Sequence, residues 1–584
     1  MKYDNSLSDK EATSIQQEKE GKMLIRILLL SQWITSSLSS NLLLLTPPVT
    51  KYSTKSHADN LIALGKGLIK SGHQVSISKQ GTVRLDNLGN ISLFEISSPV
   101  SPEHVELVGE AIRNSSIDSL YQNISYIKMD KLYKVVWDAF IEDCRTMLSD
   151  CSVEERLKKF DLIVIDQYFF CGFLLVEKYK KPFVMYECSS YITYSQAAIP
   201  GPVSWVPTFL SSLTDKMTII DRMRNIISNI HLTVVLDNLD RIFEDLKVEM
   251  KISPGKSISE IRKDAQLFLV NSDYIFEFPR PLTPNIVQVG GILASQPVDD
   301  TNIHQKFHEI TIKRFGIIAF GSALDFCHHP TLLEKISNIL KNFKDIHWIW
   351  SLKCQLDKEY SNIHIFKWIP QVYLLSKENC VLLISHGGLN SVYEAMYHST
   401  PVLVLPLPAD SMDNSVRFKR HGALEILPFH TKGVSSLNEY IFKMLKVKSY
   451  SESARRVSSL LNSQKPKPLE KAVYWIEHIL KFGGNHLRHS AIDMPAYKLY
   501  NIDLFTIILI IFLLTICAFL TTEKLFDELS SPSHMLCRLR FMFSLRSTIR
   551  VRVKALICGR FSVASVLDNL FNVPTYFMKL TVSS

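Results

Sequence analysis

The strongest constraint on the fold is a regular alternation of short apolar runs with amphipathic segments. An apolar run at residues 42–45 is followed by a segment with Leu61, Leu64 and Leu68 on one helical face, and then by an apolar run at residues 75–77. Short buried strands joined by amphipathic helices are typical of a parallel sheet covered by helices. The pattern therefore predicts an α/β fold whose first helix ends at Gly72.

The same alternation returns along the rest of the chain. It predicts a strand at 162–165, a helix at 172–179 and a strand at 183–186, and then a second series of strands at 316–320, 347–350, 363–366, 381–384 and 402–405. Between the two series, residues 278–300 are rich in Pro and Gly and interrupt the pattern. We therefore predict two Rossmann-like domains facing a cleft: residues 41–289, a linker at 290–300, and residues 301–500 with the helices that return from the second domain.

Residues 1–40 are interpreted as an extension plus a signal peptide. From Met23 the chain carries Arg26, a short apolar run and a small-residue stretch that ends at Ser40, which is the pattern of a secretory signal. A buried first strand is the alternative, but the run at 42–45 fits that role better. Residues 1–21 are polar and precede the signal, so either translation starts at Met23 or the gene model is extended.

A helix at residues 503–522 is predicted to cross a membrane, because its residues 504–522 are apolar and uncharged and about 20 such residues span a bilayer. The segment at 523–584 is rich in Lys and Arg, and the positive-inside rule places this basic tail in the cytosol and the bulk of the chain in the lumen. Glycosylation sequons at Asn90, Asn114 and Asn123 fit a lumenal orientation.

Composition excludes some partners. The 66 Lys and Arg against 57 Asp and Glu give a formal net charge of +9, much of it near the C-terminus, so we expect no nucleic-acid partner. The ten Cys contain no pair of CxxC motifs, so no structural zinc is expected. Cys144 and Cys151 are close enough in sequence to form a disulfide in the lumen, but two buried free thiols are at least as consistent with the sequence.

Residues 368–414 carry the most specific chemistry. A predicted strand runs into Ser385-His386-Gly387-Gly388, and a helix opens near Asn390. Two glycines at a strand-to-helix turn let a ligand approach the backbone, and free N–H groups at a helix start suit an anion such as a diphosphate. His386, Asn390 and Ser391 are placed to add hydrogen bonds.

Two further residues of this segment suit a nucleoside. Glu394 lies about two helical turns after His386, where a carboxylate can accept hydrogen bonds from ribose hydroxyls. Trp368 offers a flat face for a base. Taken alone, the His-Gly-Gly sequence is a turn and Trp368 is more often a core residue, so only the combination points to a nucleoside diphosphate.

Together these motifs resemble the signature of the UDP-glycosyltransferase family, of the animal UDP-glucuronosyltransferase type. The resemblance covers roughly residues 41–522 and includes residues 276–285, Phe320-Gly321-Ser322 and residues 486–503. It implies a GT-B fold with a C-terminal transmembrane helix, a position in the endoplasmic-reticulum membrane, and an inverting transfer of glucuronate or glucose from a UDP-sugar to a small lipophilic hydroxyl acceptor. It also implies no catalytic metal, and it suggests a homo-oligomer.

The resemblance also implies a set of donor-binding residues. These are Ser322, Trp368, Gln371, His386, Gly388, Asn390, Ser391, Glu394, Asp410 and Ser411. Trp368 would stack on uracil beside Gln371; Ser322, His386, Asn390 and Ser391 would hold the diphosphate; Glu394 would bind ribose and Asp410 the sugar hydroxyls. Ser411 departs from the family, which usually has Gln there, and a shorter side chain puts donor choice and activity in doubt. Asn414 keeps its place.

The family's general base corresponds to His57, which follows the first strand, and Asp166 ends the strand at 162–165. By resemblance, Asp166 orients His57 and stabilises its imidazolium. The alternatives are a packed or capping histidine and a helix N-cap. His73, at the far end of the same helix, is wrongly placed.

The sequence does not determine which sugar is transferred or which acceptor receives it. Arg280 is a candidate for binding a glucuronate carboxylate only because it lies near the linker, and a salt bridge is its alternative role. Apolar residues at 168–173 and 192–209 suit an acceptor pocket or a buried core. A catalytically silent binding or chaperone-like relative and a membrane-lipid glycosyltransferase are the competing functions.

Overall fold

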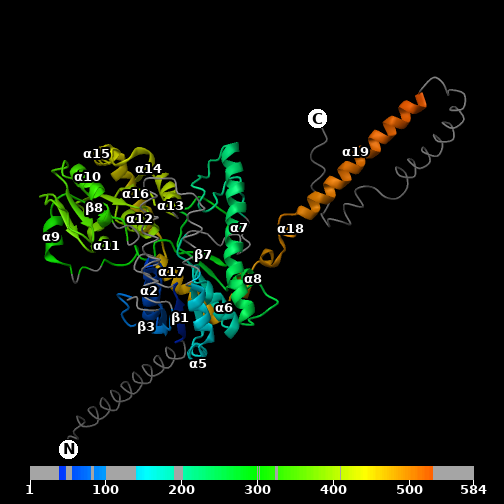
Figure 1. Ribbon diagram of the computed structural model, residues 1–584, viewed down its shortest axis with the longest axis horizontal. Coiled ribbons are helices and arrows are strands. Elements are labelled where there is room, and N and C mark those ends of the chain that lie inside the picture. Colours follow the sequence, from blue (N-terminus) through cyan, green and yellow to red (C-terminus); the bar gives the residue numbers. More distant parts are fainter. Residues whose placement is uncertain are drawn as a thin grey trace, which may run out of the picture. The chain divides into compact units, whose positions relative to one another are not determined.

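A computed structural model describes residues 39–47, 55–80, 85–99, 138, 140–189, 201–298, 300, 303–321, 326–407 and 410–530. The chain divides into two compact units, Met1–Asp493 and Met494–Ser584. The first unit contains two parallel sheets, each covered by helices (Figure 1). The α/β class and the two predicted Rossmann-like sheets are thereby confirmed.

The first sheet has seven parallel strands in the order β3-β2-β1-β4-β5-β6-β7. They are β1 (Asn41–Leu45), β2 (Gln74–Gln80), β3 (Ser92–Ile96), β4 (Leu162–Asp166), β5 (Phe183–Glu187), β6 (Phe268–Val270) and β7 (Ile286–Gln288). All residues of β4 and β5 are buried, because parallel strands lie between layers of helices and need apolar side chains on both faces.

The helices of the first sheet are α2 (Lys55–Lys70), α5 (Cys151–Leu157), α6 (Phe170–Tyr179), α7 (Ile219–Glu249) and α8 (Ile258–Lys263). Two of these helices, α2 and α6, lie where the sequence predicted them, and the other three were not predicted. Leu61, Leu64 and Leu68 of α2 are buried against the sheet as expected. The first turn of α6 starts before the predicted Gly172. Figure 1 shows α7, which the apolar pattern did not predict, as one long continuous helix.

The second sheet has six parallel strands in the order β10-β9-β8-β11-β12-β13. They are β8 (Phe315–Ala319), β9 (His347–Ser351), β10 (Ile363–Phe366), β11 (Cys380–Ser385), β12 (Val402–Val404) and β13 (Leu424–Ile426). Its helices are α9 (Gln305–Thr311), α10 (Pro330–Leu340), α11 (Gln371–Leu375), α12 (Leu389–Tyr397), α13 (Ser411–Lys419), α14 (Phe429–Lys432), α15 (Leu437–Lys446) and α16 (Ser449–Ser463). Short 3-10 turns lie at Phe326–His328 and Val434–Ser436.

One late helix returns to the first sheet. α17 (Pro468–Phe482) packs on α2, and two further 3-10 turns follow at Asn485–Leu487 and Ser490–Asp493. A Cβ added at Gly67 of α2 would lie 2.8 Å from Leu469 and 3.0 Å from Val473 of α17. The small residue on α2 therefore lets the two helices approach closely. Through α17, the chain that follows the second sheet packs on a helix of the first sheet.

The cysteine pairing differs from both predicted alternatives. Cys144 forms a disulfide with Cys171 of α6, and Cys327 forms one with Cys354. Cys151 is a free, exposed thiol at the start of α5. The predicted Cys144–Cys151 pair was wrong because sequence proximity says nothing about which helix packs against Cys144.

The second unit contains α18 (Ala496–Leu499) and α19 (Ile502–Ser530). Among the described residues, one helix, Ile502–Leu525, is long and apolar enough to cross a membrane, and it includes the predicted span. Its apolar side chains are exposed. The first 38 residues of the predicted extension and signal peptide (residues 1–40), the tail beyond 530, and the sequons at Asn114 and Asn123 lie outside the described residues, whereas Asn90 is exposed.

Candidate active site

Each sheet has one point at which the strand order reverses, between β1 and β4 in the first sheet and between β8 and β11 in the second. In open α/β sheets, ligands bind outside the carboxyl ends of the strands at such switch points. His57 lies in the first turn of α2, which follows β1, and Asp166 is the last residue of β4. The first sheet therefore brings these two side chains together.

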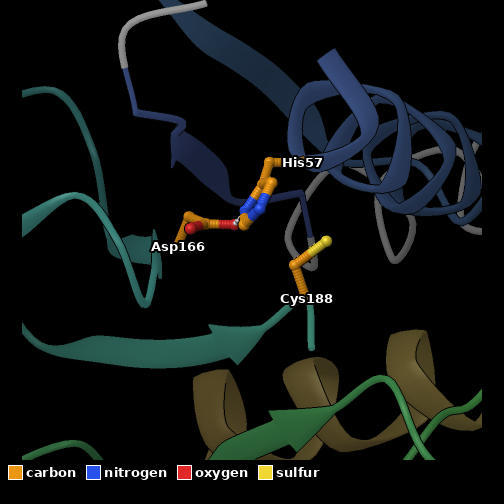
Figure 2. A group of neighbouring side chains, drawn as sticks. All are labelled: His57, Asp166 and Cys188. Atoms are coloured by element: carbon orange, nitrogen blue, oxygen red, sulfur yellow. Dashed lines mark hydrogen bonds and ion pairs between the residues drawn. The ribbon is translucent and has the colours of Figure 1, made fainter. Parts of the chain in front are cut away.

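The contact between them is direct. His57 Nδ1 lies 2.9 Å from Asp166 Oδ2, and the Asp166 side chain is fully buried (Figure 2). The other oxygen of Asp166 accepts a hydrogen bond from the Tyr168 amide at 3.0 Å. The Tyr168 ring meets the His57 ring edge-on at 5.2 Å. Asp166 thus contacts the imidazole and caps the turn that follows β4, whereas the alternative role as N-cap of the next helix is wrong, because the N-cap of α6 is Phe169 and no side chain caps that helix.

The electrostatics favour a charged imidazole after proton uptake. Burial lowers the pKa of His57, but the Asp166 carboxylate opposes this effect and the net pKa lies well above 6.5. His73 lies just before β2, at the opposite edge of the sheet, and its ring contacts Glu477 at 3.4 Å. The structure therefore places His73 away from Asp166, as the sequence predicted.

Glycines shape the second switch point around His386. Gly387 has a φ of +91°, which favours glycine, and Gly388 is the N-cap of α12. A Cβ at Gly388 would lie 2.5 Å from His386 Nε2, and one at Gly321 would lie 3.0 Å from His386 Cε1. The turns after β8 and β11 therefore need glycine to make room for this imidazole.

This end of α12 is suited to an anion. No side chain caps the helix, so its first N–H groups remain available. Burial lowers the pKa of His386, although Asp410 opposes the effect, so the ring is neutral near pH 7. Among the described residues, His386 Nδ1 is buried without a hydrogen-bond partner. A neutral ring with a free nitrogen beside a helix N-terminus can bind a phosphate oxygen.

Three more predicted donor residues form a cluster. Gln371 Nε2 donates to Glu394 Oε2 at 2.6 Å and to Ser391 Oγ at 3.1 Å. Burial raises the pKa of Glu394 to about 7. Trp368 is 68% exposed, which excludes a role as a core residue, and Lys55 Nζ lies 5.5 Å from its ring centroid.

The turn before α13 holds the remaining predicted residues. Asn414 Nδ2 donates to Asp410 Oδ2 at 2.9 Å and to the Gly387 carbonyl at 3.3 Å, which ties this turn to the His386 turn. Ser411 is the first residue of α13 and is buried. Ser322 lies outside the described residues.

Sequence analysis did not predict the hydrogen bonds that join the two sheet regions. Asn390 Oδ1 accepts hydrogen bonds from Asn60 Nδ2 at 3.4 Å and from Asn271 Nδ2 at 3.3 Å. The Asp413 carboxylate accepts from the amides of Leu210 and Ser212. These partners are far apart in sequence, and the available signal was weak: Asn60 follows His57 by one helical turn.

Arg280 has the alternative role that the sequence allowed. Its guanidinium donates to Glu277 Oε1 at 2.8 Å, and Arg417 binds the other oxygen of Glu277 at 3.1 Å. These three side chains are buried. These three residues form an ion-pair network that joins residues 276–281 to α13.

The strand order is the same about the two switch points. One switch point carries the His57–Asp166 pair and the other a glycine turn at a helix N-terminus. This arrangement is that of a GT-B glycosyltransferase. The solved glycosyltransferase of kitacinnamycin shares this fold with a TM-score of 0.52 at 14% identity, over 76% of this chain and 99% of that one. The chain belongs to the family described as UDP-glucoronosyl and UDP-glucosyl transferase, whose model matches residues 49–530.

Its relatives support this membership. Human UDP-glucuronosyltransferase 2A2 is 28% identical, over 88% of this chain and 98% of the relative. Rat 2-hydroxyacylsphingosine 1-beta-galactosyltransferase is 28% identical, over 62% of this chain and 68% of the relative. The family resemblance of the sequence motifs is thereby confirmed, and the protein is a UDP-glycosyltransferase.

Proposed function

We propose that the protein transfers glucuronate or glucose from a UDP-sugar to a hydroxyl of a small lipophilic acceptor, with inversion at the anomeric carbon. His57 is the general base and Asp166 orients it. The observation that carries this proposal is the 2.9 Å contact between His57 Nδ1 and Asp166 Oδ2 at the first switch point. It leaves Nε2 of the same ring for the acceptor.

The reaction is a single displacement. As His57 takes the hydroxyl proton, the acceptor oxygen forms a bond to the anomeric carbon, and the bond from that carbon to the diphosphate oxygen breaks. UDP leaves from the face opposite the attack, so an α-linked donor gives a β-linked product. The imidazolium that forms is stabilised by the buried Asp166 carboxylate.

The second sheet region would hold the donor. Trp368 stacks on uracil with Gln371 beside it, Glu394 accepts from ribose, and Asp410 and Ser411 contact the sugar. Ser322, His386, Gly388, Asn390 and Ser391 surround the diphosphate. The free nitrogen of His386 and the uncapped start of α12 support this assignment, because both suit the charge that develops on the departing UDP.

The first sheet region, residues 41–289 in our assignment, would hold the acceptor. Tyr168, Phe169, Phe170 and Phe243 line a small recess of this region. Because Tyr168 also contacts the His57 ring, an acceptor whose apolar part lies against Tyr168 would present a hydroxyl near the base. Residues 301–500 form the donor domain, joined by the segment 290–300.

We further propose that this enzyme lies in the endoplasmic-reticulum membrane with its catalytic part in the lumen and its tail in the cytosol. The helix Ile502–Leu525 supports a membrane anchor. Two disulfides fit an oxidising compartment, and Asn90 of a sequon is exposed.

A membrane lipid is the second candidate acceptor, and the similarity to rat 2-hydroxyacylsphingosine 1-beta-galactosyltransferase favours it. A catalytically silent relative is the third candidate, favoured by Ser411 in place of the usual Gln. His57 in contact with Asp166 opposes it, because a silent protein has no need for an oriented base.

Release of UDP from microsomes that contain the full chain separates these candidates. UDP-glucuronate and UDP-glucose are offered separately with phenols, steroids or a ceramide, and His57→Ala is the control. Release that requires a phenol or steroid and disappears in the control supports the proposal. Release only with ceramide favours the lipid acceptor, and no release from protein that still binds UDP favours the silent relative.

A further inference from the structure

A third potential ligand lies beside His57 and Asp166. Cys188 is a buried free thiol that directly follows β5, the neighbour of β4 in the sheet. One ligand atom each from His57, Asp166 and Cys188 lies within 4.8 Å of the other two, and Figure 2 shows these three neighbouring side chains, which come from separate elements. Within the described part of the chain, this is the one such group of three.

Hydrogen bonds hold the three side chains in place. His57 Nδ1 contacts Asp166 Oδ2 at 2.9 Å, and Asn60 Nδ2 donates to Cys188 Sγ at 3.3 Å. Asp166 is the last residue of β4 and Cys188 directly follows β5, and these two strands are adjacent and fully buried. The group is therefore held by the sheet and by the first turns of α2, and little reorganisation is needed to bring its atoms closer together.

The donor set has a clear chemical preference. Imidazole nitrogen, carboxylate oxygen and thiolate sulfur are the ligands of Zn²⁺, with bond lengths of about 2.0–2.3 Å and tetrahedral geometry. A thiolate in the set selects against Mg²⁺ and Ca²⁺, which prefer oxygen ligands. Three protein ligands leave a fourth position open for water.

We propose that His57, Asp166 and Cys188 form an inhibitory site for one thiophilic divalent cation, Zn²⁺ or Cd²⁺. The binding part of this proposal stands on the geometry alone, and the inhibitory part rests on the proposed role of His57 as the base. The ion takes a lone pair from one nitrogen of the neutral imidazole, whose other nitrogen keeps its hydrogen, and one from Asp166. The second proton of a charged imidazole and the proton of the Cys188 thiol pass to the solvent as the metal–nitrogen and metal–sulfur bonds form. No electron is transferred.

Inhibition follows from the loss of the base. An imidazole whose lone pair is shared with a metal is no longer positioned to take the acceptor's proton, and the ion also occupies space next to that hydroxyl. Donor binding, which depends on the second sheet region, is not affected. The cation therefore lowers turnover and leaves the affinity for UDP unchanged.

Cadmium titration of the full chain in detergent tests the site, because Cd²⁺–thiolate bonds absorb in the ultraviolet. The background protein carries Cys151→Ser, since Cys151 is an exposed free thiol that would bind Cd²⁺ by itself. Cys188→Ser is compared with Cys380→Ser, the matched control, because Cys380 is also a buried free thiol but belongs to the second sheet. Affinity for UDP shows that each variant is folded.

We expect Cys188→Ser to lose one equivalent of the absorption and to weaken Cd²⁺ binding at least about tenfold, while Cys380→Ser matches the background. Zn²⁺ inhibition of transfer should weaken by the same factor in Cys188→Ser. Unchanged Cd²⁺ absorption in Cys188→Ser would overturn the site. That result leaves the proposed function intact, because the effect of His57→Ala on metal-free transfer judges it separately.

Discussion

The two sheets have the same order of strands about their switch points but differ in what lies there. At the first switch point, two side chains, His57 and Asp166, are in contact. At the second, Gly321, Gly387 and Gly388 lack side chains and thereby leave space for His386. In the function that we propose, the first sheet supplies the base and the second binds the anion, because the residues after each strand determine what a site on this fold does.

This comparison predicts that the two halves fail in different ways. Damage to the first switch point should stop the chemical step and leave donor binding intact. Damage to the second should weaken donor binding directly. Each prediction below tests whether the two functions separate in this manner.

The largest effect is expected for His57→Ala, which should lower turnover by about 10²–10⁴-fold because the general base is lost. Asp166→Asn should act in the same direction. UDP affinity, measured by calorimetry, should stay within about twofold of the unmutated protein, because the donor residues lie on the other sheet region. His73→Ala is the matched control on the far side of α2. A parallel loss of UDP affinity in His57→Ala would contradict the separation of functions.

A weaker effect is expected for Gly388→Ala. The added Cβ would lie 2.5 Å from His386 Nε2, so the imidazole or the turn must move. Overpacking of this kind costs about 1–3 kcal/mol, and UDP affinity should fall roughly tenfold or more. Gly255→Ala is the control, since a Cβ there would meet no atom within 4 Å. Equal UDP affinity in the two variants would show that the glycine turn does not shape the donor site.

The Glu394 carboxyl group should make the binding of a nucleoside to the second sheet region dependent on pH. The pKa of Glu394 is about 7, so the carboxyl is protonated below that pH and loses acceptor strength towards ribose. Uridine, which has a ribose but no phosphate, should bind about tenfold more weakly at about pH 6 than at about pH 8. Burial lowers the pKa of His386, and uridine has no phosphate for that ring to bind.

Glu394→Gln provides the corresponding control, because a glutamine does not titrate. Its affinity for uridine should be flat across the same range. A pH dependence that persists in this variant would assign the titration to another group and remove Glu394 from the ribose site.

The smallest effect is expected for Ser411→Gln, which restores the residue usual in the family. One added hydrogen bond to the sugar is worth about 0.5–1.5 kcal/mol, which corresponds to roughly two- to tenfold in kcat/KM for the preferred donor. Comparison of UDP-glucose with UDP-glucuronate measures the effect. No change with either donor would show that the buried start of α13 does not contact the sugar.

Much of the fold was predictable because short apolar runs alternate clearly with helices. Strands such as β4 and β11 were found from their Leu, Ile and Val residues. The strands β3, β6, β7 and β13 were missed: β3 carries Ser and Glu, and the other three are only three residues long and carry no period. The long helix α7 was missed because many of its apolar side chains are exposed and do not mark a single buried face.

The site was predictable where chemistry is local in sequence and unpredictable where it is not. The His386 turn and Glu394 lie within one segment, so their spacing was informative. The pairing of Cys144 with Cys171 and the position of Cys188 beside His57 depend on the packing of separate elements. No pattern in the chain encodes those contacts: the disulfide needs α6 beside Cys144, and Cys188 comes near Asp166 only because β4 and β5 are neighbours.

The stereochemistry of the product tests the central claim most directly, because a base on one sheet region and a donor cradle on the other require attack from the face opposite UDP. A UDP-sugar with an α linkage is supplied with a phenol that gives UDP release, and proton NMR assigns the anomeric configuration of the glycoside. The account predicts a β-linked product. An α-linked product would contradict a single displacement driven by His57.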